Sequence, residues 1–125
     1  MLQTARIVAY IPVADLDRAR KFYEETLRIK PKEAHTAGVL YECGQGTTCF
    51  MYTSAEAGTS KASTLFWAVA DVEAEVAELK ARGVVFEEYD NPGFKTVNSI
   101  ATGGGAKSAW FKDTEGNILA LSQQL

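Results

Sequence analysis

The chain repeats a short pattern, and this internal repeat constrains the fold more than any other feature of the sequence. Residues 11–16 (IPVADL) recur 56 positions later as residues 67–72 (WAVADV). A second echo, at an offset of 70, relates residues 41–46 (YECGQG) to residues 111–116 (FKDTEG). A repeat of this kind in a short chain predicts two equivalent modules around a shared core.

Length, charge and composition narrow the class of protein. A chain of 125 residues with 46% hydrophobic content suits one soluble globular domain, with modules at about 1–54 and 63–125 and a linker at 55–62. The net charge of −3 argues against nucleic-acid binding, because phosphates require a basic surface. No apolar run is long enough for a membrane span, and the N-terminus lacks the regions of a signal peptide, so we expect a cytoplasmic protein.

The hydrophobic pattern predicts a strand, a helix and three strands, twice over, which is an α+β fold. Asp15 and Asp71 are the expected helix N-caps, and Gly83 is placed to end the second helix. The predicted strands are 6–13, 30–35, 39–43, 47–53, 64–70, 84–90, 107–113 and 117–122. The second module holds 14 more residues between its helix and its final hairpin (70 − 56), and a triple glycine at 103–105 lies in this insertion.

Alternation along the strands predicts which side chains share a sheet face. In the first strand of each module, one set of alternate residues is apolar (Ile7, Ala9, Ile11 and Val13; Leu65, Trp67 and Val69), as expected of a face covered by a helix. If the two sheets curl toward each other, their other faces line a shared concave surface suited to a small ligand. The predicted ligand-binding residues are Tyr10, Phe50, Tyr52, Thr64, Phe66, Phe94 and Trp110. The alternative is a collapsed face that only fills the fold.

Three motifs carry a resemblance to a known family. They are VADLDRA at 13–19 followed by Phe22 and Tyr23, VADV at 69–72, and FKDTEGN at 111–117. With the paired β-α-β-β-β pattern, they resemble the vicinal oxygen chelate superfamily, which includes glyoxalase I, extradiol dioxygenases and bleomycin resistance proteins. The third motif is similar to the family's Asp-Pro-Asp-Gly-Asn hairpin, with Thr114 and Glu115 in the middle. The resemblance covers the whole chain. It implies two tandem βαβββ modules, forming a curved, barrel-like mixed sheet around a concave site, and a homodimer.

The resemblance also implies four metal-ligand positions, which metal-dependent members fill with His, Gln or Glu. The matching residues here are Val8, Phe50, Thr64 and Ala120. None is an imidazole or a carboxylate, so we expect no metal cofactor. The alternative is a divalent metal held by displaced ligands, such as His35, Glu33, Glu42 or Asp113. We interpret His35, the only histidine, as an exposed edge-strand residue.

These observations favour a metal-free small-molecule binding protein of the glyoxalase/bleomycin-resistance type, with an aromatic-lined concave pocket. The alternative is a lyase, isomerase or dioxygenase-like enzyme acting on a small oxygenated substrate. Such an enzyme would use a displaced metal, or Tyr10 or Glu42 as an acid–base group. A third hypothesis is a regulatory module whose own aromatic side chains fill the pocket.

Smaller features are assigned by the same reasoning. Glu42 and Lys112 occupy equivalent hairpin positions, where they either pair across the site or, as we favour, form a solvated pair at its rim. The glycines at 103–105, flanked by Lys95 and Lys107, fit an anion-binding loop or, as we favour, a turn before a strand. Cys43 and Cys49 match neither a redox Cys-x-x-Cys nor a zinc-binding spacing, and we interpret them as reduced thiols packed in strands.

Overall fold

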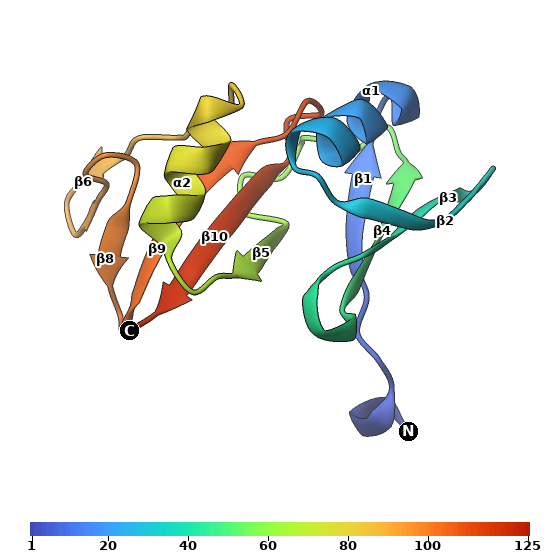
Figure 1. Cartoon of the computed structure of the whole chain (residues 1–125), viewed down its shortest axis with the longest axis horizontal. Helices are drawn as coiled ribbons and strands as arrows, with labels where there is room; N and C mark the ends of the chain where they lie inside the picture. The colour runs from blue at the N-terminus through green and yellow to red at the C-terminus, as the bar shows by residue number, and fades with distance from the viewer.

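The computed structural model describes residues 1–125, and its main strands form two four-stranded mixed sheets. The first sheet has the order β1-β4-β3-β2, with β1 (Ala9–Val13), β2 (Lys30–His35), β3 (Gly38–Glu42) and β4 (Thr48–Thr53). The second has the order β5-β10-β9-β8, with β5 (Leu65–Ala68), β8 (Ala101–Gly103), β9 (Ala106–Lys112) and β10 (Ile118–Gln124). Figure 1 shows the two sheets side by side, and neither closes into a barrel. The predicted α+β fold of two modules is confirmed.

Each module carries one helix, and each helix begins at its predicted aspartate. Helix α1 (Leu16–Lys21) continues as the π-helical turn η2 (Phe22–Thr26), and α2 spans Val72–Ala81. Asp15 accepts a hydrogen bond from the backbone N–H of Arg18 and Asp71 from that of Ala74, both at 3.1 Å. Gly83, at φ +92°, ends α2 as predicted. Neither helix has the length and hydropathy that a membrane span requires.

The sheet registers follow the two offsets of the sequence repeat. In the parallel pairs, Ala9 lies opposite Cys49 and Leu65 opposite Leu119. In the antiparallel hairpins, Tyr41 lies opposite Cys49 and Phe111 opposite Leu119. Shifting the first-strand residues by 56 and the hairpin residues by 70 therefore converts one register into the other. Side chains at matched positions of the two modules consequently occupy equivalent places on their sheets.

Two predicted strands differ from the structure. The strand predicted over 6–13 begins only at Ala9, because β4, its parallel partner, starts at Thr48 and the register places residues 6 and 7 opposite the turn that precedes it. Residues 6–8 and the short 3₁₀ turn η1 (Leu2–Thr4) form an exposed arm, which projects from the body in Figure 1. The other strands of the first module, with β5, β9 and β10, lie within two residues of their predicted bounds.

The strand predicted over 84–90 is the second correction. Only Phe86 bridges β9, opposite Phe111, and the N–H of Glu87 donates to the Trp110 carbonyl at 2.8 Å. The chain then leaves the sheet as a hairpin of β6 (Asp90–Asn91) and β7 (Phe94–Lys95), and returns to the same edge as β8. The extra residues of the second module therefore split its edge strand in two.

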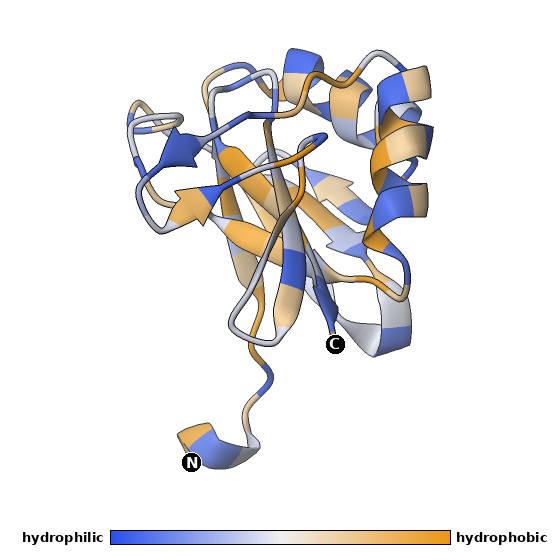
Figure 2. Ribbon diagram, turned by 90° about the vertical axis from the view of Figure 1, so that its left-hand side faces the viewer, coloured by the Kyte–Doolittle hydropathy of each residue, from blue (hydrophilic) through white to orange (hydrophobic).

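One hydrophobic core lies between the sheets and their helices. Its 17 buried residues come from both modules, from Ile11 and Val13 of β1 to Phe111 of β9 and Leu119 of β10. In Figure 2 the strands at the centre are mainly orange, whereas the helices carry much of their blue on the outside. The helix-side faces of both sheets thus contribute to a single core, and the opposite faces point outward.

Glu115 joins the β9–β10 hairpin of the second module to the start of α1 in the first. Its side chain is 0% exposed, and its carboxylate accepts hydrogen bonds from the backbone N–H groups of Ala14 (3.0 Å) and Asp15 (2.9 Å). Arg18 adds two more, from Nε at 2.9 Å and Nη2 at 3.0 Å, and Thr114 donates its hydroxyl at 2.7 Å. The Arg18 hydrogen bond lowers the pKa of Glu115 to about 2, against the effect of burial.

Asp113 and Asn117 complete this connection, which we call the inter-module clamp (Asp113, Glu115 and Asn117). Asp113 accepts the Tyr23 hydroxyl at 2.5 Å, the Asn117 amide at 2.9 Å, and the backbone N–H groups of Glu115 and Asn117 at 2.8 Å. The Asn117 amide also donates to the Pro12 carbonyl at 2.7 Å, and its oxygen accepts from the Gly58 N–H at 3.2 Å. Gly58, at φ +73°, must be glycine here, because a Cβ would lie 2.2 Å from the Glu115 carbonyl oxygen.

Candidate functional site

The outer face of the first sheet carries a row of aromatic side chains. Tyr10 on β1 lies opposite Phe50 on β4, with ring centroids 6.2 Å apart, and its ring also meets that of Tyr52 at 4.8 Å. The exposed ring of His35, on the edge strand β2, lies 6.2 Å from Phe50. We call Tyr10, Phe50 and Tyr52 the first aromatic face; Tyr10 is 65% exposed, so this face is open.

The outer face of the second sheet carries an equivalent group. Phe66 on β5 and Trp110 on β9 flank Ala120 of β10, matching Tyr10, Leu40 and Phe50 of the first sheet. Phe94, from the inserted β7, packs against Trp110 at 5.2 Å and against Tyr89 at 5.3 Å. We call Phe66, Phe94 and Trp110 the second aromatic face. Phe66 is 63% exposed, and Phe94 is anchored on Trp110.

A single chain does not bring the two aromatic faces together. Every aromatic pair on these outer faces joins residues of the same module. Both faces also lie opposite the buried sides of their sheets, which form the shared core. Thr64, the remaining predicted ligand-binding residue, is half-buried, and its N–H donates to the Ile118 carbonyl at 2.8 Å. The assignment of these seven residues to a ligand site stays a prediction.

The four positions that match metal ligands in the family do not fit a divalent metal. Val8 lies in the exposed arm, Phe50 belongs to the first aromatic face, and Ala120 is buried between Phe66 and Trp110. Thr64 supplies only a hydroxyl. Nowhere in the chain do three His, Cys, Asp or Glu side chains gather in a geometry that would hold a metal ion. The donor chemistry of these positions therefore differs from that of a metal centre.

The charged residues considered for the site interact with other side chains than those expected. Glu42 lies 3.6 Å from Lys32, and Lys112 lies 3.5 Å from Glu87, so a Glu42–Lys112 pair, across a site or at its rim, is wrong. The reason is that β3 and β9 belong to different sheets. The carboxylate of Asp113, considered above as a displaced metal ligand, instead accepts the four hydrogen bonds of the inter-module clamp.

The triple glycine forms the turn of the β8–β9 hairpin, where Gly103 pairs with Ala106. Gly104 and Gly105 have φ of +61° and +80°, which favours glycine at both central positions of the turn. Of the two flanking lysines, Lys107 pairs with Glu73 at 2.8 Å. The interpretation as a turn before a strand is confirmed.

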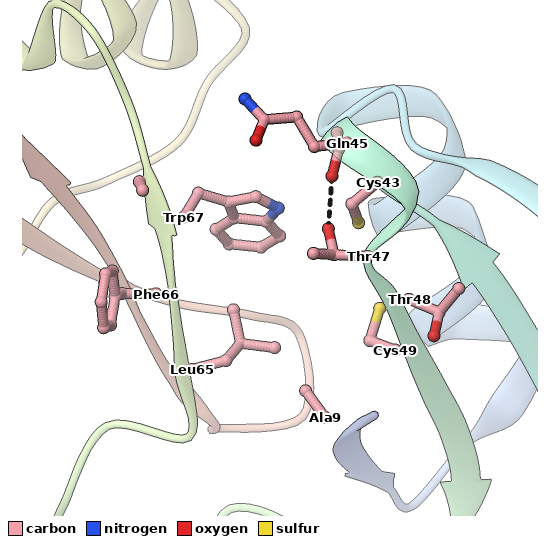
Figure 3. Close-up of a pocket in the computed structure, with 11 residues that line it drawn as sticks. Ala9, Cys43, Gln45, Thr47, Thr48, Cys49, Leu65, Phe66 and Trp67 are labelled. Carbon is pink, nitrogen blue, oxygen red and sulfur yellow. Dashed lines mark hydrogen bonds between the residues drawn. The ribbon is translucent and has the colours of Figure 1, made fainter. Parts of the chain in front are cut away.

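A cavity of about 440 Å³, open to solvent on one side, lies between the modules where β1 and β4 approach β5, and we call it the seam cavity. Its walls come mainly from helix-side residues of these strands (Ala9, Cys49, Leu65 and Trp67) and from the turn after β3. The lining residues are Ala9, Cys43, Gly44, Gln45, Thr47, Thr48, Cys49, Leu65, Phe66, Trp67 and Ala68. Figure 3 shows Leu65 and Trp67 on one side, with Cys43, Thr47 and Cys49 opposite them. Phe66 is the one predicted ligand-binding residue that lines it.

Sequence reasoning missed this cavity because it treated the helix-side faces as packed core. Trp67 borders two adjoining cavities as well, of about 220 and 420 Å³. The only signal in the sequence was a tryptophan at a position where the first module has Ile11. Because an indole is much larger than the isoleucine side chain at the matched position, the two modules do not pack identically here, and the Trp67 indole borders open space.

The family follows from comparison with known proteins. A family model described as the Glyoxalase/Bleomycin resistance protein/Dioxygenase superfamily matches residues 3–121, and the chain belongs to this superfamily. No match was found among curated proteins.

Solved structures resemble the chain over nearly its whole length. A glyoxalase/bleomycin resistance protein from Catenulispora acidiphila DSM 44928 is 20% identical, with a TM-score of 0.68 over 98% of this chain and 100% of its own. TnmS3, an antibiotic binding protein from Streptomyces sp. CB03234, is 23% identical, with a TM-score of 0.64 over 98% of both chains. A lactoylglutathione lyase from Agrobacterium tumefaciens is 19% identical, with a TM-score of 0.67 over 96% of this chain and 93% of its own. At these identities the likeness concerns the fold, which hosts several functions.

Proposed function

We propose that this protein binds a flat, mainly apolar small molecule without a metal, between aromatic faces contributed by two copies of the chain. The observation that carries the proposal is the chemistry of the outer faces. None of the four positions where metal-dependent relatives place ligands holds an imidazole or a carboxylate, and aromatic rings flank two of them, Phe50 in the first sheet and Ala120 in the second. Aromatic side chains give a site broad apolar contact, and the Tyr10 hydroxyl and Trp110 indole N–H add polar contacts.

A homodimer supplies the geometry that one chain lacks. A two-fold axis that places the first aromatic face against the second face of another copy creates two identical sites at once. Exposure supports this arrangement, because Tyr10 and Phe66 are each more than 60% exposed and occupy equivalent positions on β1 and β5. Exposed aromatic groups, such as those on each of these faces, commonly mark an interface. An antibiotic binding protein among the structural neighbours supports small-molecule binding as the function of such a site.

The dimer has a direct test. We expect wild-type protein to sediment as a dimer, and Phe66→Glu to sediment as a monomer. The glutamate leaves a charge unpaired at the centre of the interface, which raises the dimer dissociation constant by roughly a hundredfold or more. Sedimentation velocity across a range of concentrations measures the change. Ala77→Glu, on the exposed side of α2, is the matched control and stays dimeric.

A wild-type protein that sediments as a monomer at all concentrations would contradict the shared site. The enzyme alternative, with Tyr10 or Glu42 as acid–base group, stays a prediction. In the structure, Glu42 pairs with Lys32, and Tyr10 meets only rings. No contact of either residue favours catalysis over binding.

A further inference from the structure

The two cysteines of the chain lie on one wall of the seam cavity. Cys49 on β4 pairs with Tyr41 on β3, and Cys43 follows Tyr41 by two residues, so both thiols project from the same face of the hairpin. Cys49 is only 3% exposed, whereas Cys43 is half-buried. The cavity therefore offers an accessible thiol beside an inaccessible one.

The second module completes the surroundings of Cys43. Figure 3 shows the Trp67 ring extending from β5 into the cavity, with its indole nitrogen on the side nearest Cys43. The Cys49 thiol and the Trp67 indole N–H are donors that lie near the Cys43 sulfur in Figure 3. Because these two donors stabilise a thiolate, they lower the pKa of Cys43 to about 6 despite burial. The pKa of Cys49 is raised by the neighbouring Cys43 and by burial.

We propose that the seam cavity captures flat conjugated carbonyl compounds, and that the Cys43 sulfur adds to them covalently. In this addition the thiolate forms a bond to the β-carbon of the carbon–carbon double bond. The π electrons move to the carbonyl oxygen, giving an enolate, which takes a proton from water. No oxidant, reductant or leaving group is needed. This site shares only Phe66 with the aromatic faces and is built around a different group, the Cys43 thiol, so the inference goes beyond the proposed function.

The lining selects this class of ligand. Leu65, Trp67 and Ala68 make one wall apolar, with the indole available for stacking, and the volume of about 440 Å³ accommodates a small ring compound. The exposed Gln45 lies at the opening, where its amide meets no other side chain and is free to donate to a carbonyl oxygen. Three charged residues line the adjoining cavity together with Cys43; they are Arg28, Lys30 and Glu42.

Two maleimides test the proposal, because both carry the same conjugated carbonyl group and only one carries an aromatic substituent. Intact-protein mass spectrometry follows the rate of adduct formation with N-phenylmaleimide and N-ethylmaleimide between pH 5 and 9, with glutathione as reference. We expect one adduct per chain, half-maximal rate near pH 6, and a plateau above neutral pH. The ratio of the phenyl rate to the ethyl rate is expected to be about fivefold higher at Cys43 than at glutathione, because the phenyl ring stacks on Trp67.

Variants locate the effect. Cys43→Ser abolishes the fast adduct, while Trp67→Phe and Cys49→Ala keep it but move the midpoint toward about 8.5, the value of an ordinary thiol. Trp67→Phe retains a ring for stacking and so keeps the phenyl preference. Circular dichroism establishes that each variant is folded. The proposal is overturned if Cys43→Ser reacts as fast as wild type, if the wild-type midpoint lies near 8.5, or if the phenyl preference equals that of glutathione.

Discussion

Replacing Glu115 with alanine is expected to destabilise the protein by about 4 kcal/mol, because five hydrogen bonds to one buried carboxylate are lost together. The backbone N–H groups of Ala14 and Asp15 lose their acceptor, and Arg18 loses its ion-pair partner. Urea unfolding at pH 7 measures the loss. Glu25→Ala, on the exposed side of the turn that follows α1, is the control and changes stability by less than about 0.5 kcal/mol.

The same carboxylate predicts a pH dependence of stability. The pKa of Glu115 is about 2 in the folded protein and 4.5 in an unperturbed carboxyl, so the folded state favours the ionised form. Its contribution is fully present above pH 4.5 and is lost as the pH falls from 4.5 toward 2, by about 3 kcal/mol. Unfolding free energies from pH 7 down to pH 2.5 are expected to converge between wild type and Glu115→Gln. A difference that stays constant over this range would show that the charge of Glu115 contributes nothing.

Asp113→Ala is expected to cost about 3 to 4 kcal/mol, because it leaves four buried donors without an acceptor. The smaller change Tyr23→Phe removes only one of these donors and costs about 1 to 2 kcal/mol. Since both substitutions break the same hydrogen bond, the double variant is expected to lose less than the sum of the two single losses. Additive losses in urea unfolding would contradict a direct Tyr23–Asp113 interaction. Burial, with Asp113 as the next cause, raises the pKa of Tyr23, so its hydroxyl remains a donor throughout.

The clamp also shows what the sequence pattern could predict of the fold. The repeated VAD motifs located both N-caps, and alternation located most strands, because these signals depend on neighbouring residues. The interruption of the edge strand in the second sheet was not predicted. The inserted segment is stabilised by hydrogen bonds from Thr96 and Ser99 to Glu88, which precedes them by 8 and 11 residues. The family hairpin was identified from FKDTEGN, but the partners of Glu115 lie about 100 residues earlier, and no local pattern reveals them.

The candidate sites illustrate a second limit of sequence reasoning. The alternation of side chains along the strands correctly placed Tyr10 and Phe66 on the sheet face opposite the core, as their exposure shows. It could not decide whether the two outer faces meet within one chain, because that depends on how the modules pack. Both faces of these strands are apolar, so hydropathy alone does not determine which side becomes the shared core. The seam cavity was not predicted for the same reason, because Trp67 and Cys49 lie on the same faces of their strands as the residues that form the core.

Dye binding in the presence of a chelator tests the central claim, a metal-free aromatic site, most directly. Nile red, a flat neutral fluorophore, is titrated into wild-type protein, Trp110→Ala, Tyr10→Ala and Ala77→Glu in EDTA. We expect saturable binding of one dye per chain, unchanged by EDTA, and weakened roughly tenfold or more by either aromatic substitution but not by Ala77→Glu. Binding that disappears in EDTA and returns with a divalent metal would contradict the account, as would equal affinities for Trp110→Ala and wild type.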